Sequence, residues 1–455
     1  MTEPDPIAQP QRIAVIGGGI SGLATAWILA QRHEVTLYER EHRLGGHSQT
    51  LAWPTPQGPL GLDCGFMVYN TRNYPHLTRI LACLGIETQP TDMSFSVRFA
   101  DSGFEWAGSG WRTFFSSPQG LLDPLRWRLL RGILAFGQKA RGVLAQNTLS
   151  ADLTLGDFLD AIGTESVVTE RYLLPMAASI WSAPSASLLD HPARALIQFL
   201  DHHGLLKLWG RPRWRSIPGG SIRYVQALRR EIRASWRLGD AVTRLVPQGH
   251  EVTLLTAKGG SETYDRVVLA CHADQAYTLL DPACRARSWL QHFSTVRNRA
   301  WVHQDGSLMP ARRTLWSSWN FFADTPDLES QPIAITYWLN RLQRLATPEP
   351  YFVTLNREPR SGSILSEMEF EHPCYRLETL RAQAEAAHWQ GHDRLYYAGA
   401  WLGSGFHEDG AASAAALASC FRLPLPWNRE TAIPVTISNP PFTPALPGPA
   451  VDADA

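Results

Sequence analysis

The pattern of apolar and polar residues in the first forty positions predicts a strand, then a helix, then a second strand. Residues 13–16 form a short apolar run of the kind found in buried parallel strands. Residues 20 to about 32 have helical spacing, and residues 34–38 form the second strand. This order is typical of an α/β fold built on a parallel sheet.

Strand patterns return in the second half of the chain. Residues 241–246, 251–257 and 262–264 have the spacing of a three-stranded antiparallel meander, and a buried strand follows at 266–270. Residues 333–340 alternate with a period of two, which predicts a strand of an antiparallel sheet. Further strand candidates are residues 94–99, 103–106, 316–320, 351–355 and 395–398.

Helical patterns separate these strands. Residues 121–144 form the longest one, an amphipathic helix with five basic residues. It either contacts a bilayer surface or an amphiphilic substrate, or packs on the substrate domain with its arginines in solvent. The apolar run at 172–184, which contains Trp181, either faces a substrate or belongs to the core. Other predicted helices are residues 74–84, 222–233 and 409–421.

Three glycines link the first strand to the first helix. Gly17, Gly19 and Gly22 have the G-x-G-x-x-G spacing. The first permits a tight turn, the second lets the backbone approach a pyrophosphate, and the third packs the helix against the strand. The helix begins at Ile20 and Ser21, where N–H groups and the helix dipole suit a diphosphate. The stretch therefore predicts a dinucleotide site.

The residues after the second strand indicate which dinucleotide binds. Glu39 ends that strand 22 residues after Gly17, near the offset at which a carboxylate binds ribose hydroxyls. The R-x-G-G pattern at 43–46 resembles the second signature of the FAD-binding amine oxidase and phytoene desaturase superfamily. The resemblance implies FAD, with an arginine near the diphosphate and glycine backbone beside the ribityl chain. The residues concerned are Glu39, Arg40, Arg43, Gly45, Gly46 and His47.

Other segments resemble the same superfamily. Residues 63–70 resemble its D-x-G segment, which implies that Gly65 and Phe66 approach the isoalloxazine, whereas Asp63 is either part of that approach or a turn former. The P-G-G-S turn within 217–221 marks the return to the FAD domain, and Val242 is expected beside the adenine. Residues 397–411 resemble the C-terminal flavin motif. That motif implies cofactor contacts by Gly399, His407, Glu408, Asp409 and Ala411.

The resemblance implies an α/β, Rossmann-like FAD-binding domain of glutathione-reductase type. A substrate domain of antiparallel sheet plus helices (α+β) is expected to be interleaved with it. The predicted FAD domain comprises residues 1–70, 215–290 and 391–422, and the predicted substrate domain comprises residues 71–214 and 291–390. Residues 423–455 are proline-rich and are predicted to form a disordered or loosely docked tail.

Departures from the superfamily bear on the substrate. An acidic residue usually follows the A-G of the last strand, but Ala400 and Trp401 stand there. Amine oxidases carry a lysine near flavin N5, and residues 259–455 contain none. His407 stands where an aromatic cage residue faces the flavin. Because amines are oxidised within such a cage, these differences argue against an amine substrate.

His407 and Glu408 are the candidate catalytic residues because they precede the helix expected to abut the flavin. Hydride transfer to flavin N5 leaves one proton to be managed, and a histidine with a pKa near neutrality suits that task. Alternatively, His407 only hydrogen-bonds the cofactor and Asp409 caps the helix. His372 and His303 are secondary candidates.

Composition excludes several other classes of protein. The 455 residues carry no net charge, which gives no electrostatic footprint for nucleic acid. Six scattered cysteines predict neither a zinc site nor a disulfide framework, so no metal site is expected. The polar N-terminus does not resemble a signal peptide, and no run of about 18 apolar residues occurs. A cytoplasmic protein is predicted, with residues 121–144 at the inner membrane surface as the open alternative.

The leading hypothesis is an FAD-dependent oxidoreductase that oxidises or desaturates an apolar substrate. Residues 316–320, 337–343 and 405–410 resemble a subgroup of NAD/FAD-binding oxidoreductases whose relatives accompany cyclopropane-fatty-acid-synthase-like enzymes. That resemblance implies a lipid acyl chain as substrate. The alternatives are an amine oxidase, a redox-neutral flavin isomerase or mutase, and a non-catalytic protein that binds flavin and lipid or a partner enzyme.

Overall fold

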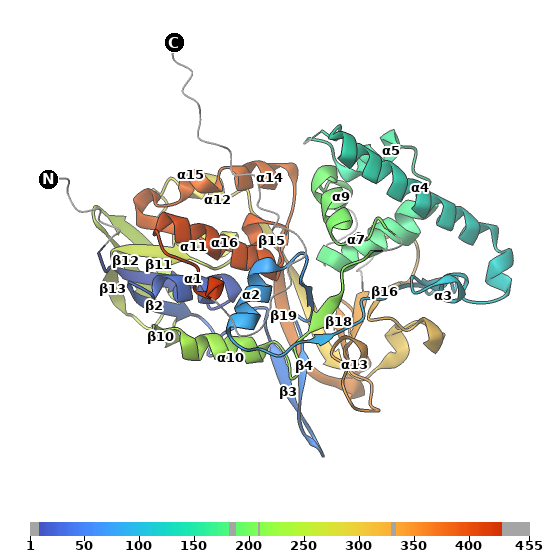
Figure 1. The fold of residues 1–455 in the computed structure, drawn as a ribbon, viewed down its shortest axis with the longest axis horizontal. Coiled ribbons are helices and arrows are strands. Elements are labelled where there is room, and N and C mark those ends of the chain that lie inside the picture. Colours follow the sequence, from blue (N-terminus) through green and yellow to red (C-terminus); the bar gives the residue numbers. More distant parts are fainter. Residues whose placement is uncertain (1–8, 151, 182–187, 208–209, 329–333, 430–455) are drawn as a thin grey trace, which may run out of the picture.

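The computed structural model describes residues 9–150, 152–181, 188–207, 210–328 and 334–429. Two regions lie side by side, and each contains one large sheet (Figure 1). We call them the parallel-sheet region, which contains the N-terminal strand, and the antiparallel-sheet region. The predicted class, α/β with a parallel and an antiparallel sheet, is confirmed.

Within the described residues, the parallel-sheet region has five parallel strands in the order β10-β2-β1-β14-β20. Side chains alternate between the two faces of a strand, and the packing of β1 follows this period. Ile13 and Val15 pack with helices on one face, whereas Ala14 and Ile16 pack with an antiparallel meander on the other. The strands are β1 (Arg12–Ile16), β2 (Glu34–Glu39), β10 (Ser235–Leu238), β14 (Arg266–Leu269) and β20 (Leu395–Tyr397).

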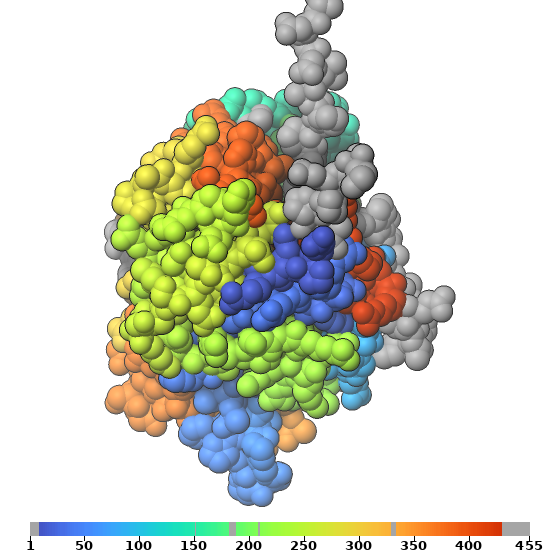
Figure 2. Space-filling view, turned by 90° about the vertical axis from the view of Figure 1, so that its left-hand side faces the viewer, coloured from blue at the N-terminus to red at the C-terminus, as the bar shows by residue number. Residues whose placement is uncertain are grey.

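The parallel sheet is therefore the middle layer of three. Figure 2 looks onto this end of the molecule, where the meander (yellow-green) lies beside the N-terminal segment (blue). The helical layer contains α1 (Ile20–Leu29), α2 (Pro75–Cys83), α10 (Ile222–Glu231) and α16 (His407–Cys420). The other layer contains β11 (Val242–Gln248), β12 (Glu251–Thr256), β13 (Ser261–Tyr264), α11 (Ala273–Leu279) and α12 (Arg287–Leu290).

The antiparallel-sheet region has, in the described ranges, seven strands in the order β19-β15-β18-β17-β16-β7-β8. All neighbours are antiparallel except β16 and β7, which pair in parallel. The strands are β7 (Phe95–Phe99), β8 (Glu105–Ala107), β15 (Ser294–His303), β16 (Trp319–Ala323), β17 (Ala334–Trp338), β18 (Phe352–Leu355) and β19 (Ile364–Cys374).

A helical layer packs on this sheet through Val97, Phe99, Phe321 and Ile335. Its helices are α3 (Trp111–Phe115), α4 (Pro124–Gln146), α5 (Leu155–Ala161), α6 (Ser166–Val168), α7 (Leu174–Trp181) and α9 (Ala193–His202). The remaining elements are the hairpin β3 (Thr50–Thr55) and β4 (Gly58–Asp63), the small sheet of β5 (Tyr69–Asn70), β6 (Gln89–Pro90) and β9 (Trp214–Ser216), and the helices α13 (Leu339–Leu342), α14 (Leu377–Ala384) and α15 (Ala386–Trp389).

The structure corrects some predicted element boundaries. The helix expected at 121–144 is divided: Gln119–Leu122 form a 3₁₀ turn, and α4 begins at Pro124. The division occurs because the Asp123 carboxylate accepts a hydrogen bond from the Leu125 N–H (2.9 Å) and caps the new helix. The strand expected at 333–340 ends at Trp338, and its Thr336 side chain is fully buried.

Two segments pack differently from the predicted domain division. Helix α2 lies within the predicted substrate domain, but its Leu77 and Ile80 pack in the core of the parallel-sheet region. Trp427, in the predicted tail, is buried there against Trp27, with ring centroids 5.7 Å apart. The rest of that tail, residues 430–455, lies outside the described residues. Over the described part of the chain, no helix combines the length and apolar character needed to cross a membrane.

Candidate functional site

A cavity of about 1260 Å³ runs between the parallel-sheet and antiparallel-sheet regions. The turn before α1 and the end of β2 form one end of its wall, and α7, α9 and the antiparallel sheet form the other. Most of the predicted cofactor residues line it. They are Gly17, Gly19, Ile20, Ser21, Glu39, Arg40, Arg43, Gly45, Gly46, His47, Gly65, Phe66, Val242, Gly399 and His407.

At the end beside α1, which we call the glycine end, backbone segments pass too closely for side chains. A Cβ atom on Gly17 would lie 2.7 Å from the Ala270 carbonyl oxygen, and its φ of +109° disfavours any other residue. A Cβ atom on Gly65 would lie 2.3 Å from the His47 carbonyl oxygen. By contrast, a Cβ atom on Gly19 would meet nothing within 4 Å. The start of α1 therefore presents bare backbone N–H groups to the cavity, as a diphosphate requires.

Charged side chains flank this backbone at the end of β2. The Glu39 carboxylate accepts a hydrogen bond from the Gly18 N–H (2.7 Å), so it lies beside the glycine turn as the sequence predicts. Arg43 donates to the Gly46 carbonyl oxygen (2.9 Å) and to Gln49 Oε1 (3.0 Å). Arg43 thus fixes its own loop while it lines the cavity.

His407, the first residue of α16, lines the cavity. Its ring stacks on Phe66, with centroids 3.8 Å apart and planes 14° apart. Its Nε2 atom shares hydrogen bonds with Ser48 Oγ (2.8 Å) and the Tyr224 hydroxyl (3.2 Å). Burial lowers the pKa of His407 to about 3. His407 is therefore a neutral imidazole near pH 7, and the predicted pKa near neutrality is wrong.

The structure places Glu408 away from the cavity, which contradicts its predicted catalytic and cofactor roles. Its two carboxylate oxygens accept hydrogen bonds from the N–H groups of His76 (2.8 Å) and Leu77 (3.0 Å), at the start of α2. Burial raises the pKa of Glu408 to about 8. Glu408 thus caps a neighbouring helix, because consecutive side chains on α16 point in different directions.

Three more predicted cofactor residues lie behind the cavity wall. The Asp409 carboxylate accepts a hydrogen bond from the Phe406 N–H (2.8 Å), so it stabilises the start of α16 from the third helical position. Burial raises the pKa of Asp409 to about 6. Ala411 is fully buried in the core of the parallel-sheet region. Gly22 faces the Gly17 carbonyl oxygen, which a Cβ atom would approach to 1.9 Å, so its role is close packing.

Asp63 is expected from the sequence either to take part in the approach to the isoalloxazine or to form a turn, and its contacts give it a structural role. Its carboxylate accepts hydrogen bonds from Thr50 Oγ1 (2.6 Å) and from the N–H (2.8 Å) and hydroxyl (2.9 Å) of Ser221. Burial raises the pKa of Asp63 to about 6. The residue therefore ties the β3–β4 hairpin to the P-G-G-S turn before α10.

Three histidines meet in the cavity wall. The ring centroid of His47 lies 5.8 Å from that of His272 and 5.4 Å from that of His372, and all three line the cavity. Burial lowers the pKa of His272, and it lowers that of His372 to about 4. His372 is only a secondary candidate from the sequence, and His272 is not a candidate there although it stands just after the carboxyl end of β14. His303 is buried inside the antiparallel sheet, where it shares a hydrogen bond with Thr354.

The opposite end, which we call the aromatic end, is walled by rings and aliphatic side chains. The Phe199 ring centroid lies 4.8 Å from that of Phe406 and 4.8 Å from that of Trp181. Trp181 thus faces the cavity and also belongs to the core, so both interpretations of the apolar run hold for it. The other apolar side chains of this end include Met93, Phe95, Met176, Ile180, Leu205, Trp319, Tyr337, Leu355 and Tyr375.

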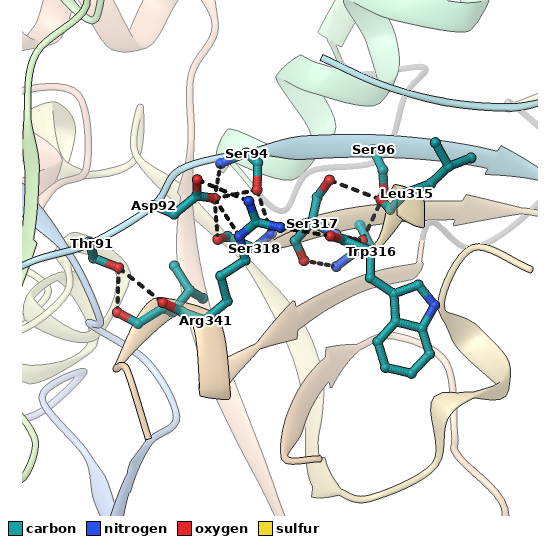
Figure 3. Close-up of polar contacts among 11 residues, drawn as sticks. Thr91, Asp92, Ser94, Ser96, Leu315, Trp316, Ser317, Ser318 and Arg341 are labelled. Carbon is teal, nitrogen blue, oxygen red and sulfur yellow. Dashed lines mark hydrogen bonds and ion pairs between the residues drawn. The ribbon is translucent and has the colours of Figure 1, made fainter. Parts of the chain in front are cut away.

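A polar cluster borders the aromatic end (Figure 3). Asp92 Oδ1 accepts hydrogen bonds from the Ser94 N–H (2.8 Å) and the Ser318 hydroxyl (2.9 Å), and Arg341 Nε lies 3.0 Å from the same oxygen. These contacts lower the pKa of Asp92 although burial opposes the shift. Asp92 lines the cavity as half of an ion pair, and no lysine is among the described residues of the wall.

The geometry of the glycine end agrees with the protein family that the sequence matches. Residues 20–316 match the family described as flavin containing amine oxidoreductase. The chain belongs to this family. Its cofactor is FAD, and the glycine end fits that cofactor because Gly19 has no side chain to cover the backbone N–H groups at the start of α1, which face the cavity.

Relatives share only part of the sequence. A putative flavin-containing monoamine oxidase of Mycobacterium tuberculosis is 27% identical over 286 residues, which are 59% of this chain and 59% of the relative. A carotenoid phi-ring synthase of Streptomyces griseus is 38% identical over 108 residues, which are 23% of this chain and 19% of the relative. The matched part thus spans less than two thirds of each of these relatives.

Solved structures share the fold over about nine-tenths of this family member. A fatty acid isomerase from P. acnes superposes with a TM-score of 0.66 at 16% identity, over 90% of this chain and 98% of that one. A putrescine oxidase double mutant superposes with a TM-score of 0.65 at 14% identity, over 91% of this chain and 99% of that one. At these identities the likeness shows the fold alone.

Proposed function

We propose that this family member oxidises or desaturates an apolar substrate, a lipid acyl chain, by removing a hydride from a carbon held in the cavity. The observation that supports this function is the continuity of the cavity from the glycine end to the aromatic end. FAD supplies the hydride acceptor. Rings such as Phe199 and Phe406 hold the chain of methylene groups and exclude water from the reacting carbon.

The side chains of this protein shape the cavity and accept the proton that the reaction releases. The stacked pair of Phe66 and His407 forms part of the cavity wall. Desaturation also releases a proton, and the Nε2 atom of His407 is already engaged by Ser48 and Tyr224. We assign that proton to His272 and His372, whose rings also line the cavity.

A second candidate function is the oxidation of an amine. It is favoured by the aromatic side chains around Trp181 and by the monoamine oxidase and putrescine oxidase among the similar proteins. Two features oppose it. The wall has no lysine among its described residues, and Asp92, which could bind a cationic amine, is neutralised by Arg341.

A redox-neutral isomerase or mutase would use the same cavity. The similar fold of a fatty acid isomerase supports it, and it requires the hydride to return to the substrate. A non-catalytic protein that binds flavin and lipid, or a partner enzyme, is the remaining alternative. It predicts a flavin spectrum that no substrate changes.

The deciding experiment is an anaerobic visible spectrum of the purified holoprotein, recorded with mono-unsaturated or methylated phospholipids and then with putrescine. Bleaching by the lipid supports acyl oxidation, and bleaching by the amine alone replaces the proposal with amine oxidation. Lipid conversion without bleaching or acceptor consumption identifies the isomerase. A spectrum indifferent to all of them, with no product, supports the binding protein.

A further inference from the structure

One surface carries all of the large apolar side chains that are exposed in the described part of the chain. We call it the apolar surface: Trp111, Leu121, Leu122, Trp127 and Leu134. Leu122 is 84% exposed and Trp111 is 66% exposed. They lie on α3, the turn Gln119–Leu122 and α4, at the end of the molecule away from α1 and β2 (Figure 1). Such a concentration marks an interaction site, since exposed apolar residues are normally scattered.

The folded protein holds these side chains in place. The Trp111 ring stacks on Phe115, with centroids 5.6 Å apart and planes 4° apart. The Trp127 ring lies 4.8 Å from the same Phe115, and its indole N–H donates to the Leu121 carbonyl oxygen (2.8 Å). Because the rings are already ordered, their burial against a partner costs little conformational entropy.

The segment that carries the apolar surface is basic although the whole chain is neutral, and one of its arginines, Arg128, is paired with Glu165 (2.7 Å). Residues 111–146 contain six basic residues and one acidic residue. Arg112, Arg131 and Arg141 are exposed. Arg126 is buried and donates to the carbonyl oxygens of Phe114 (2.7 Å) and Glu105 (3.0 Å), so its role is structural. Exposed tryptophan and leucine on a segment with exposed arginines match the interface of an anionic bilayer.

The cavity reaches the surface close to Trp111. Gly108 and Ser109 line the cavity and are themselves exposed, and only Gly110 separates them from Trp111, the first residue of α3. Exposed Arg211 and Arg213 also line it. A molecule that left a bilayer next to the apolar surface would therefore meet an opening to the aromatic end.

We infer that the apolar surface docks this protein onto a bilayer of anionic phospholipid, so that an acyl substrate passes from the bilayer into the cavity. Docking rests on the exposed side chains and their charge. Only the passage of substrate rests on the proposed function.

Flotation of the holoprotein with vesicles tests the docking. The wild type is expected to float with vesicles that contain phosphatidylglycerol, to bind pure phosphatidylcholine vesicles less, and to lose binding as salt is raised. Leu122→Ser is expected to weaken partitioning about tenfold, because one exposed leucine no longer enters the bilayer. Arg131→Glu should also weaken it, whereas Arg229→Glu, an exposed position on α10, should leave it unchanged.

Two results would overturn the inference. Equal flotation of the wild type and Leu122→Ser is one, and absence of wild-type flotation with either vesicle is the other. If sedimentation velocity also shows a dimer that Leu122→Ser converts to a monomer, the surface binds a second copy instead. Anaerobic bleaching by detergent-dispersed lipid separates the two proposals, because it does not require docking.

Discussion

The two ends of the cavity are built on opposite principles. At the glycine end the backbone itself forms the wall, and a single added methyl group at Gly17 would collide with Ala270. At the aromatic end the side chains form the wall, and its rings come from segments far apart in the sequence, such as Phe199 on α9 and Phe406 just before α16. The cofactor end therefore depends on glycines that lack a side chain, whereas the substrate end depends on the aromatic rings that form its wall.

Among the substitutions considered, Gly17→Ala is expected to disturb the glycine end most. Its φ of +109° and the 2.7 Å approach to the Ala270 carbonyl oxygen penalise any side chain, so we expect loss of bound FAD and a fall of about 2–4 kcal/mol in the free energy of unfolding. Flavin content and chemical denaturation measure both.

A matched control separates the collision from the backbone strain. Gly58 has a φ of +112°, but a Cβ atom there would meet nothing within 4 Å. Gly58→Ala should therefore cost about 1 kcal/mol and retain FAD. If both variants keep FAD equally well, the close approach at Gly17 does not matter for the cofactor.

Glu408→Ala tests whether the Glu408 carboxylate caps α2. The two N–H groups of His76 and Leu77 would lose their buried acceptor, so the free energy of unfolding should fall by about 2–4 kcal/mol. Glu378→Ala, an exposed position on α14, should change it by less than about 0.5 kcal/mol.

The same residue predicts a pH dependence. Burial raises the pKa of Glu408 from its ordinary 4.5 to about 8, so the folded state binds a proton more tightly than the unfolded state. The resulting stability is complete below about pH 4.5 and is lost as the pH rises towards 8. Denaturation across this window should show a smaller pH dependence for Glu408→Gln than for the wild type. An identical dependence would contradict the buried carboxyl.

At the aromatic end, Phe199→Ala should raise KM for an apolar substrate about tenfold, because the ring borders the cavity. FAD content should not change. Phe158→Ala, in the helical core and outside the described cavity wall, should lower stability without raising KM. If the two substitutions change KM equally, Phe199 acts through folding alone.

The smallest expected effect concerns His407. Its pKa of about 3 leaves it uncharged from about pH 5 to 8, so His407→Asn should alter the rate of flavin reduction without changing the shape of its pH profile. Stopped-flow reduction across that range makes the comparison. An inflection that disappears in the variant would restore His407 as the acid or base.

Prediction from sequence worked best where the required residues are close together in the chain. The turn from Gly17 to Gly22 and the carboxylate of Glu39 belong to one strand–helix–strand unit, and the structure places them together. It worked less well where the side chains of adjacent residues point in different directions. Glu408 and His407 are adjacent, yet one caps α2 and the other lines the cavity.

The sequence alone determined the cofactor end, because backbone conformation and short-range spacing specify a glycine turn and its helix. Tertiary structure alone decided which histidines meet, since His47, His272 and His372 come from three separate segments. It also decided protonation, because the pKa of His407 depends on burial by elements that no local pattern records. Local spacing predicts what the backbone does, and packing between distant segments decides what each side chain faces.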